Sequence, residues 1–309
     1  MKIALLCATR RGLLVLQKLK ALAPAAQFTV FSFPEEPWEP RFFEDIRQQT
    51  SAAGGTFFEA RRVGGDKWKS FWESAAVDLM LVVSWRYMIP PEVYRRPRLG
   101  TFVFHDSLLP GYRGFSPTVW AIINGEDHAG ATLFRISESV DAGDIVDQQR
   151  VPINSAETIA TVIERVTGAY LELLERNLQG LMAGSAPVRP QDHARATYTC
   201  RRLPVDNQIS WGASSKSIVN LIRGVSAPYS GAYSFLDGRK LTIWAAGQAP
   251  SQAPYVGRIP GRVVEILPKI GAVVLTGDGS ILIRQVQLEG EPSRCAAEVL
   301  DSLSMTLGS

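Results

Sequence analysis

The stretch FVFHDSLLPGYRGFSPTVWAIINGEDHAGATLFRISESVDAGD, residues 102–144, indicates both the fold class and the functional centre of this chain. An apolar, strand-like run delivers His105 to a turn rich in leucine and proline. A second strand-like run leads to Asp141, in a turn that contains Gly143. In open α/β sheets, ligands bind outside the carboxyl ends of the strands, so we expect His105 and Asp141 to point into one cleft. A base and a carboxylate that meet in a cleft are typical of an active site.

The residues before this stretch alternate between strand-like and helix-like runs. Ile3–Ala8 reads as a buried strand, Arg11–Ala23 as a helix with leucines along one side, and Phe28–Phe33 as the next strand. Such a β-α-β opening implies a mostly parallel sheet with helices on its faces, so the expected fold class is α/β and Rossmann-like. The first turn reads CATRRG, so the GxGxxG fingerprint of dinucleotide binding does not occur there. The alternation continues with helices expected at 41–53 and 66–75 and strands at 56–60 and 78–84.

The C-terminal part of the chain has a different pattern. A strand is expected at 144–153 and a long helix to about Gly184, and a connector rich in proline and arginine follows. Beyond it, a serine-capped helix at 214–225 precedes short alternating strands separated by Gly, Pro and Asp-Gly turns. This pattern predicts a small antiparallel β-barrel. We therefore expect a catalytic domain at residues 1–188, a linker at 189–206 and a second domain at 207–309.

Composition and charge exclude several classes of function. The 33 basic and 30 acidic residues are interspersed and leave a net charge of only +3, so the concentrated basic face of a nucleic-acid-binding protein is not indicated. The three cysteines lie far apart without a CxxC spacing, which predicts neither a metal site nor a disulfide framework and favours a reducing, cytoplasmic setting. The first apolar run is too short for a secretion signal, and none approaches the length of a membrane span.

The central stretch carries the pattern H-x-S-L-L-P-x-x-x-G, followed by D-A-G. The residues that fit this pattern are His105, Ser107, Leu108, Leu109, Pro110, Gly114, Asp141, Ala142 and Gly143. The chain thereby resembles the formyltransferases that use 10-formyltetrahydrofolate, and the resemblance extends along nearly its whole length. It looks most similar to the branch that formylates UDP-4-amino-4-deoxy-L-arabinose, with methionyl-tRNA formyltransferase somewhat further away. The resemblance implies an OB-like second domain and the pairing of subunits into homodimers.

The resemblance also implies which residues form the site. His105 and Asp141 would be catalytic. The residues that would line the pocket of the folate cofactor come from three segments, one after a central strand, one beside the Tyr-Arg-Gly turn and one leading to the catalytic carboxylate: Tyr87, Met88, Ile89, Phe115, Ser137, Glu138, Ser139, Val140 and Asp141.

Formyl transfer requires these residue types for reasons independent of any family. The amine attacks the formyl carbon, the former carbonyl oxygen becomes an oxyanion, and the amine must lose a proton. A histidine can donate to the oxyanion and move the proton, and a carboxylate across the cleft can hold the tautomer of that histidine. We therefore expect His105 to act as the proton carrier and Asp141 to orient it.

One position departs from the family pattern. The related enzymes have an Asn two residues before the histidine, where this chain has Val103. An amide donor to an oxyanion is typically worth about 3 kcal/mol, and valine offers no donor. Ser107 is the predicted replacement, with Ser84, a protonated Asp106 and a backbone N–H as alternatives. Strand alternation places Asp106 on the face opposite His105, which disfavours it.

Three functions remain open at this stage. The first is transfer of a formyl group to a small-molecule amine, such as an amino sugar nucleotide or an amino compound of a specialised pathway. The second is formylation of methionyl-tRNA. It is disfavoured because the loop Pro34–Pro40 carries Glu35, Glu36 and Glu39, which would repel phosphates. The third is a folate- or nucleotide-binding protein without transferase activity, which the valine at position 103 suggests.

Overall fold

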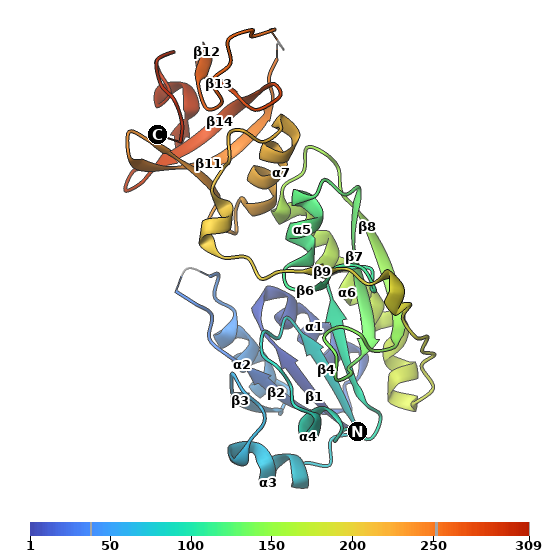
Figure 1. Ribbon diagram of the computed structural model, residues 1–309. Helices are drawn as coiled ribbons and strands as arrows, with labels where there is room; N and C mark the ends of the chain where they lie inside the picture. The colour runs from blue at the N-terminus through green and yellow to red at the C-terminus, as the bar shows by residue number, and fades with distance from the viewer. Residues whose placement is uncertain (38, 251–252, 309) are drawn as a thin grey trace. The chain divides into compact units, whose positions relative to one another are not determined.

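The computed structural model describes residues 1–37, 39–250 and 253–308, which form two compact units (Figure 1). The first unit comprises Met1–Pro117, Ala129–Val151 and Glu164–Thr199, and the second comprises Thr118–His128, Pro152–Ile163 and the described part of Cys200–Ser309. The predicted division into 1–188, 189–206 and 207–309 stays a prediction about domains. Trp38, in the acidic loop predicted at 34–40, lies outside the described residues.

A mostly parallel sheet forms the centre of the first unit, as predicted. Within the described residues it has seven strands in the order β3-β2-β1-β4-β5-β7-β8. The strands β1 to β5 run parallel, whereas β7 runs antiparallel to β5. Their bounds are Lys2–Cys7 for β1, Gln27–Ser32 for β2, Thr56–Glu59 for β3, Leu79–Val83 for β4, Thr101–His105 for β5, His128–Arg135 for β7 and Ile145–Pro152 for β8.

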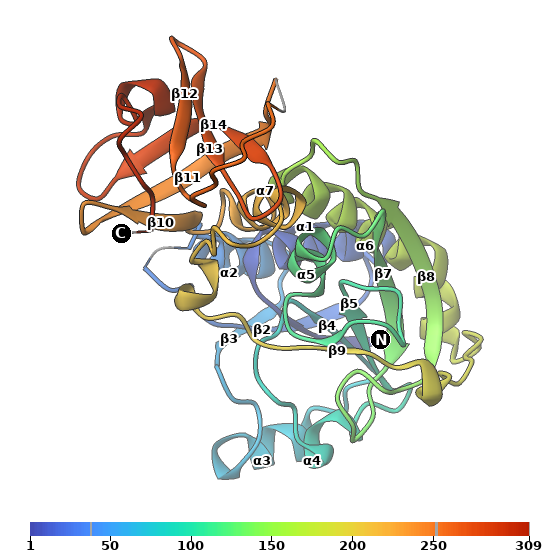
Figure 2. The same cartoon turned by 45° about the horizontal axis from the view of Figure 1, so that its top comes forward.

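Helices cover both faces of this sheet. Helices α1 (Thr9–Leu22) and α6 (Ile159–Ala183) lie side by side on one face, where Lys18 Nζ is 2.8 Å from the Glu175 carboxylate (Figure 2). On the other face, α3 (Asp66–Ser74) and α4 (Pro91–Tyr94) pack on sheet residues such as Leu6. Helix α2 (Phe43–Ala52) precedes β3. Helices α1, α2 and α3 thus confirm the helices predicted at 11–23, 41–53 and 66–75, at nearly those residues.

The second unit contains an antiparallel sheet, as predicted. In the described residues its strands follow the order β10-β11-β14-β13-β12, and β15 pairs with β14. Their bounds are Ala232–Leu236 for β10, Arg239–Gln248 for β11, Val263–Leu267 for β12, Gly271–Leu275 for β13, Ser280–Leu288 for β14 and Arg294–Cys295 for β15. Closure of this sheet into an OB-like barrel stays a prediction.

Helix α7 of the second unit begins where the sequence predicts a cap. The Ser214 hydroxyl accepts the Ser217 N–H and caps α7 (Ser215–Val225), as expected for a serine at this position. Helix α5 (Pro117–Ile123) packs closely against α7 at Gly224, where an added Cβ atom would lie 3.1 Å from the Ile123 side chain. No helix in the described residues combines the length and the apolar character that a membrane crossing requires.

Candidate active site

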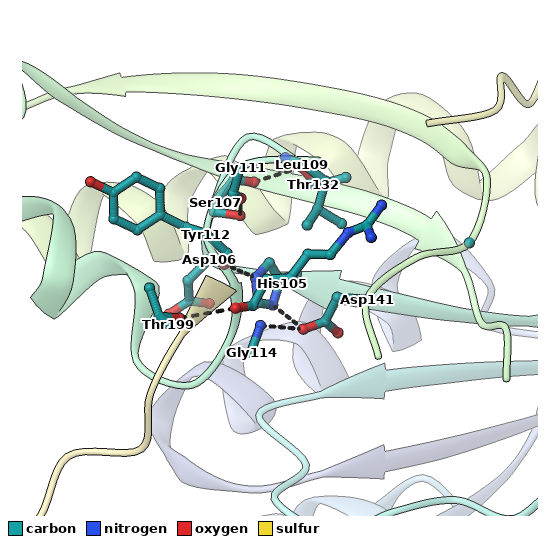
Figure 3. A network of polar contacts seen from close by, with 12 residues as sticks. His105, Asp106, Ser107, Leu109, Gly111, Tyr112, Gly114, Thr132, Asp141 and Thr199 are labelled. Carbon is teal, nitrogen blue, oxygen red and sulfur yellow. Dashed lines mark hydrogen bonds and ion pairs between the residues drawn. The ribbon is translucent and has the colours of Figure 1, made fainter. Parts of the chain in front are cut away.

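Strand β5 delivers His105 to the site, and the loop after β7 delivers Asp141 (Figure 3). The His105 Nδ1 atom lies 3.6 Å from Asp141 Oδ2, and the His105 ring is buried. On its other side, the ring faces the backbone carbonyl of Tyr112, with Nε2 at 2.9 Å from the oxygen. The structure therefore brings together the two residues that the sequence predicts to be catalytic.

These contacts determine where a proton can enter the ring. A carbonyl oxygen can only accept, so His105 Nε2 carries a hydrogen and donates it to Tyr112. In the neutral ring, the lone pair then lies on Nδ1 and faces Asp141. The separation of 3.6 Å is longer than a hydrogen bond, so a proton that reaches Nδ1 would lie between the ring and the carboxylate.

The backbone explains the Asp-Ala-Gly turn. Asp141 has φ of 50°, a left-handed conformation that few residues adopt, and its Oδ2 accepts the Gly114 N–H at 2.8 Å. A Cβ atom at Gly143 would lie 1.7 Å from the Arg135 carbonyl oxygen, so no other residue fits there without a shift of the backbone. The turn therefore fixes the direction of the carboxylate through steric exclusion and one backbone hydrogen bond.

Ser107 is the third predicted catalytic residue, and it is held within its own turn. Its hydroxyl donates to the Gly111 carbonyl at 2.7 Å, and its carbonyl accepts from the Thr132 hydroxyl at 2.6 Å (Figure 3). Thr132 also accepts the Leu109 N–H, which ties the Ser-Leu-Leu-Pro turn to β7. A role of Ser107 as an oxyanion donor stays a proposal, and it requires the hydroxyl to exchange Gly111 for the substrate.

Asp106 directly follows β5, and its side chain contacts residues of α1 and α6 instead of Asp141, as the expected alternation predicts. Its carboxylate contacts the Arg11 guanidinium at 2.6 Å and accepts the Tyr170 hydroxyl. Burial disfavours the ionised form, but the charge of Arg11 and hydrogen bonds from Arg11 and Tyr170 outweigh it and lower the pKa of Asp106. The carboxyl is therefore ionised at neutral pH, and the idea of a protonated Asp106 that donates to the oxyanion is wrong.

Two of the predicted cofactor residues line a cavity of about 390 Å³. Ser137 and Glu138 form part of its wall, together with Tyr94 and Thr101, which the sequence did not single out. The Tyr94 hydroxyl is buried and has no hydrogen-bond partner in the described part of the chain. The sequence offered no signal for Tyr94, because it reads as an ordinary core aromatic residue in a short helix.

The remaining predicted cofactor residues differ in their surroundings. Tyr87 packs edge-on against Phe33, with ring centroids 5.0 Å apart, and Ile89 belongs to the core between the sheet and α3. In contrast, the apolar side chains of Met88, Phe115 and Val140 are exposed to solvent, and so is Ser139. Exposed apolar side chains of this kind are available for contacts with a ligand.

A segment read from the sequence as part of a linker contacts the site. Strand β9 (Tyr198–Thr199) pairs in parallel with β6 (Arg113–Gly114). The Arg113 N–H donates to the Thr197 carbonyl at 2.9 Å, and the Tyr112 N–H donates to the Thr197 hydroxyl at 2.9 Å. These bonds hold the backbone whose carbonyl and N–H groups contact His105 and Asp141. Two-residue strands leave no periodic pattern, so this pairing could not be predicted from the sequence.

Comparison with known families gives two matches. The pattern of the family described as "Formyl transferase" matches residues 3–178, and the pattern described as "Formyl transferase, C-terminal domain" matches residues 204–303. The chain belongs to the formyl transferase family. The family model of the first match covers more than half of the sequence, and it contains His105, Ser107 and Asp141. The resemblance inferred from the sequence motifs is thereby confirmed.

Solved structures with a similar fold include two N-formyltransferases. The sugar 3N-formyltransferase WlaRD, studied with dTDP and 5-N-formyl-THF, aligns with 94% of this chain and 99% of its own, with a TM-score of 0.69 and 16% identity. The N-formyltransferase of Helicobacter canadensis, in complex with folinic acid and dTDP-3-aminofucose, aligns with 92% of this chain and 98% of its own, with a TM-score of 0.68 and 16% identity.

A third similar structure is longer than this chain. HypX from Aquifex aeolicus, in complex with tetrahydrofolic acid, covers 97% of this chain with a TM-score of 0.63 and 18% identity. The chain spans about half the length of HypX, at 47%. At these identities, the likeness supports the fold, which agrees with the predicted class.

Proposed function

We propose that this protein is an N-formyltransferase that moves the formyl group of 10-formyltetrahydrofolate to the amine of a small molecule. The single observation that carries this proposal is the His105–Asp141 pair at the end of β5, within a chain of the formyl transferase family. A histidine whose Nδ1 faces a carboxylate fixed by a backbone N–H is suited to accept and hold a proton.

The proposed reaction balances as a simple acyl transfer. The lone pair of the amine nitrogen forms a bond with the formyl carbon, and the carbonyl oxygen becomes an oxyanion. His105 accepts the proton from the attacking nitrogen at Nδ1, where Asp141 stabilises the resulting charge. The bond between the carbon and the folate nitrogen then breaks, and the same proton passes to the folate nitrogen. The products are a formamide and tetrahydrofolate.

The formyl donor would contact the predicted cofactor residues, which are Tyr87, Met88, Ile89, Phe115, Ser137, Glu138, Ser139 and Val140. The cavity beside Ser137 and Glu138 is also lined by Gly100 and Thr101, at the end of β5 opposite His105, so it is not the proposed folate pocket. Two observations support a folate. Exposed apolar side chains occur at Met88 and Phe115, and the similar structures contain folates. Val103 provides no oxyanion donor, so Ser107 is the proposed donor, provided that its hydroxyl releases Gly111.

The proposed acceptor is an amino sugar nucleotide or a related amino compound. WlaRD and the Helicobacter canadensis enzyme are named for action on sugars or contain a dTDP-amino sugar, which supports this class. Methionyl-tRNA is the less favoured acceptor, because the loop after β2 carries acidic residues. Glu39 of this loop pairs with Arg86 at 2.7 Å, and Glu36 lies 3.7 Å from Arg61. We also propose a cytoplasmic location and a homodimer.

Incubation with 10-formyltetrahydrofolate and a panel of amines tests this proposal. The panel includes nucleotide-linked amino sugars, free amino sugars and aminoacylated initiator tRNA, and each product is weighed by mass spectrometry. We expect one small amine to gain the mass of a formyl group. Salt-sensitive binding of tRNA, together with formylation of the aminoacylated tRNA, would show that methionyl-tRNA is the acceptor and not a small molecule. Binding of the folate without transfer to any amine would favour the third, which the valine at position 103 motivates.

A further inference from the structure

The Gln191 side chain links two segments that hold the catalytic pair. Its amide nitrogen donates to the carbonyl of Asp141 at 2.9 Å and to the carbonyl of Gly143 at 2.7 Å. Its amide oxygen accepts from the Arg113 guanidinium, from Nε at 3.2 Å and from Nη2 at 2.7 Å. Carbonyl groups only accept and a guanidinium only donates, so these partners fix the orientation of the amide.

Arg113 lies between the two backbone groups that contact the catalytic pair. The preceding residue, Tyr112, supplies the carbonyl that faces His105, and the following residue, Gly114, supplies the N–H that binds Asp141. Arg113 is only 2% exposed, and in the described residues its guanidinium contacts Gln191, Tyr198 and His193. A buried cation needs acceptors in place of water, and the Gln191 oxygen provides the shortest one.

The Asp141–Gly143 turn depends on such outside contacts. Asp141 is a non-glycine residue at positive φ, a conformation that persists only where the surroundings enforce it. Two of the contacts that hold the turn come from one side chain, Gln191, which is 5% exposed. The other end of that side chain contacts Arg113. A movement of the Asp141–Gly143 turn would therefore displace the Tyr112–Gly114 segment, and the reverse.

We propose that Gln191 is a positioning residue for the proposed formyl transfer, and that its amide couples the Asp141–Gly143 turn to the Tyr112–Gly114 segment. Through this coupling, the Asp141 carboxylate stays at its distance from His105. The catalytic consequence rests on the proposed function, whereas the coupling itself can be tested without any turnover. Gln191 does not contact the reacting atoms, so its effect is expected on the rate of the chemical step.

The variant Gln191→Glu separates the two ends of the link. A carboxylate still accepts from Arg113, and adds an ion pair, but it can no longer donate to the two carbonyls and repels them. We expect kcat to fall about 10- to 100-fold, because small misplacements of catalytic groups have effects of this size, with KM for the folate nearly unchanged. We also expect at least about tenfold faster hydrogen exchange in the segments around residues 112–115 and 140–144, since the coupling restrains both.

Asn220→Asp provides a matched control. Asn220 is also a buried amide whose oxygen accepts from a buried arginine, with Arg223 Nε at 2.9 Å, and both residues belong to the second unit. The same change from amide to carboxylate should leave hydrogen exchange in both segments of the site unchanged and kcat within about twofold. Gln191→Asn, which keeps the amide on a shorter side chain, decides the question if Gln191→Glu does not fold.

Hydrogen exchange monitored by mass spectrometry, with thermal unfolding as a check on folding, decides the proposal. Faster exchange in both segments of the folded Gln191 variant, and not in Asn220→Asp, supports the coupling. Exchange at the wild-type rate in both segments overturns it, as does an equal change in the control. If the wild-type protein formylates no amine, the proposed function fails, while the exchange measurement still decides whether Gln191 couples the segments.

Discussion

His105 and Asp106 are neighbours in sequence, yet at the end of β5 their side chains lie in different environments. His105 faces a carboxylate at 3.6 Å that comes from a turn held by backbone hydrogen bonds. Asp106 faces a guanidinium at 2.6 Å that comes from α1, and a tyrosine hydroxyl from α6. The His105–Asp141 pair thus joins the end of a strand to a loop, whereas the Asp106–Arg11 pair lies against two helices. The residue proposed to gain and lose a proton is thus directly followed by one whose charge is fixed.

The Asp106 carboxyl is ionised and the Tyr170 hydroxyl protonated at neutral pH. Burial and the charge of Asp106 raise the pKa of the Tyr170 hydroxyl well above its usual value, and Arg11 keeps the pKa of Asp106 low. The Arg11 guanidinium also lies 4.6 Å from the centre of the Tyr170 ring. These contacts join α1 and α6 to the end of β5, and so they anchor the strand that carries His105.

The largest expected effect comes from removing the proton carrier. We expect His105→Ala to lower kcat by about 10³-fold, the middle of the range for general acid–base catalysis. We expect only a small change in the free energy of unfolding, because the His105 ring makes one hydrogen bond, to Tyr112. Steady-state kinetics with the amine identified in the panel measures the effect, and a kcat within threefold of the wild type would remove His105 from the mechanism.

Removal of the Asp106 carboxylate is expected to lower the stability of the fold. Asp106→Ala leaves the Arg11 cation partly buried without its carboxylate, since the two side chains are 11% and 23% exposed. Breaking a buried ion pair in this way typically costs about 3 kcal/mol or more of unfolding free energy. Urea unfolding of wild type and variant measures the difference. A loss below about 1 kcal/mol, as for a surface ion pair, would show that the anchor is weak.

A smaller effect on rate is expected at the partner of His105. Asp141→Asn keeps an oxygen that can accept the Gly114 N–H, so the turn should persist, but it removes the negative charge that faces Nδ1. We expect kcat to fall about 10²-fold, within the range for a group that assists proton transfer. A full pH profile of kcat distinguishes loss of charge from misfolding. An unchanged profile in Asp141→Asn would assign the proton transfer to another group.

The smallest expected effect is a pH dependence of stability. The pKa of Asp106 is lower in the folded protein than its unfolded value of about 3.9, so the stabilisation is fully present above that value. It is lost as pH falls through the folded pKa. Between pH 5 and strongly acidic pH, stability should therefore decline more steeply in the wild type than in Asp106→Asn. Denaturant unfolding over this range checks the sign, and parallel curves would contradict it.

The sequence revealed the parts of this site that have local signatures. His105 and Asp141 follow strand-like runs, and the mostly parallel sheet follows from the β-α-β opening. Gly143 fits its motif because the Arg135 carbonyl leaves no room for a side chain. The predicted alternation of faces along β5 was also sufficient to place Asp106 away from His105.

The parts that the sequence missed depend on contacts between distant segments. Arg11 meets Asp106 from another helix, and Gln191 reaches Asp141 from a segment that shows no hydrophobic periodicity. Such contacts arise when the sheet brings separate loops together, so neither charge pattern nor turn residues signal them. Tyr94 was missed for the related reason that a buried hydroxyl without a partner is visible only after packing is known.

Transfer of an isotope-labelled formyl group in a single turnover tests the central claim most directly. The wild-type protein, His105→Ala and Asp106→Asn would each be mixed with labelled 10-formyltetrahydrofolate and the amine panel. We predict label on one amine with the wild-type protein, almost none with His105→Ala, and transfer retained in folded Asp106→Asn. Label that stays on the folate with the wild-type protein, or transfer by His105→Ala at the wild-type rate, would contradict it.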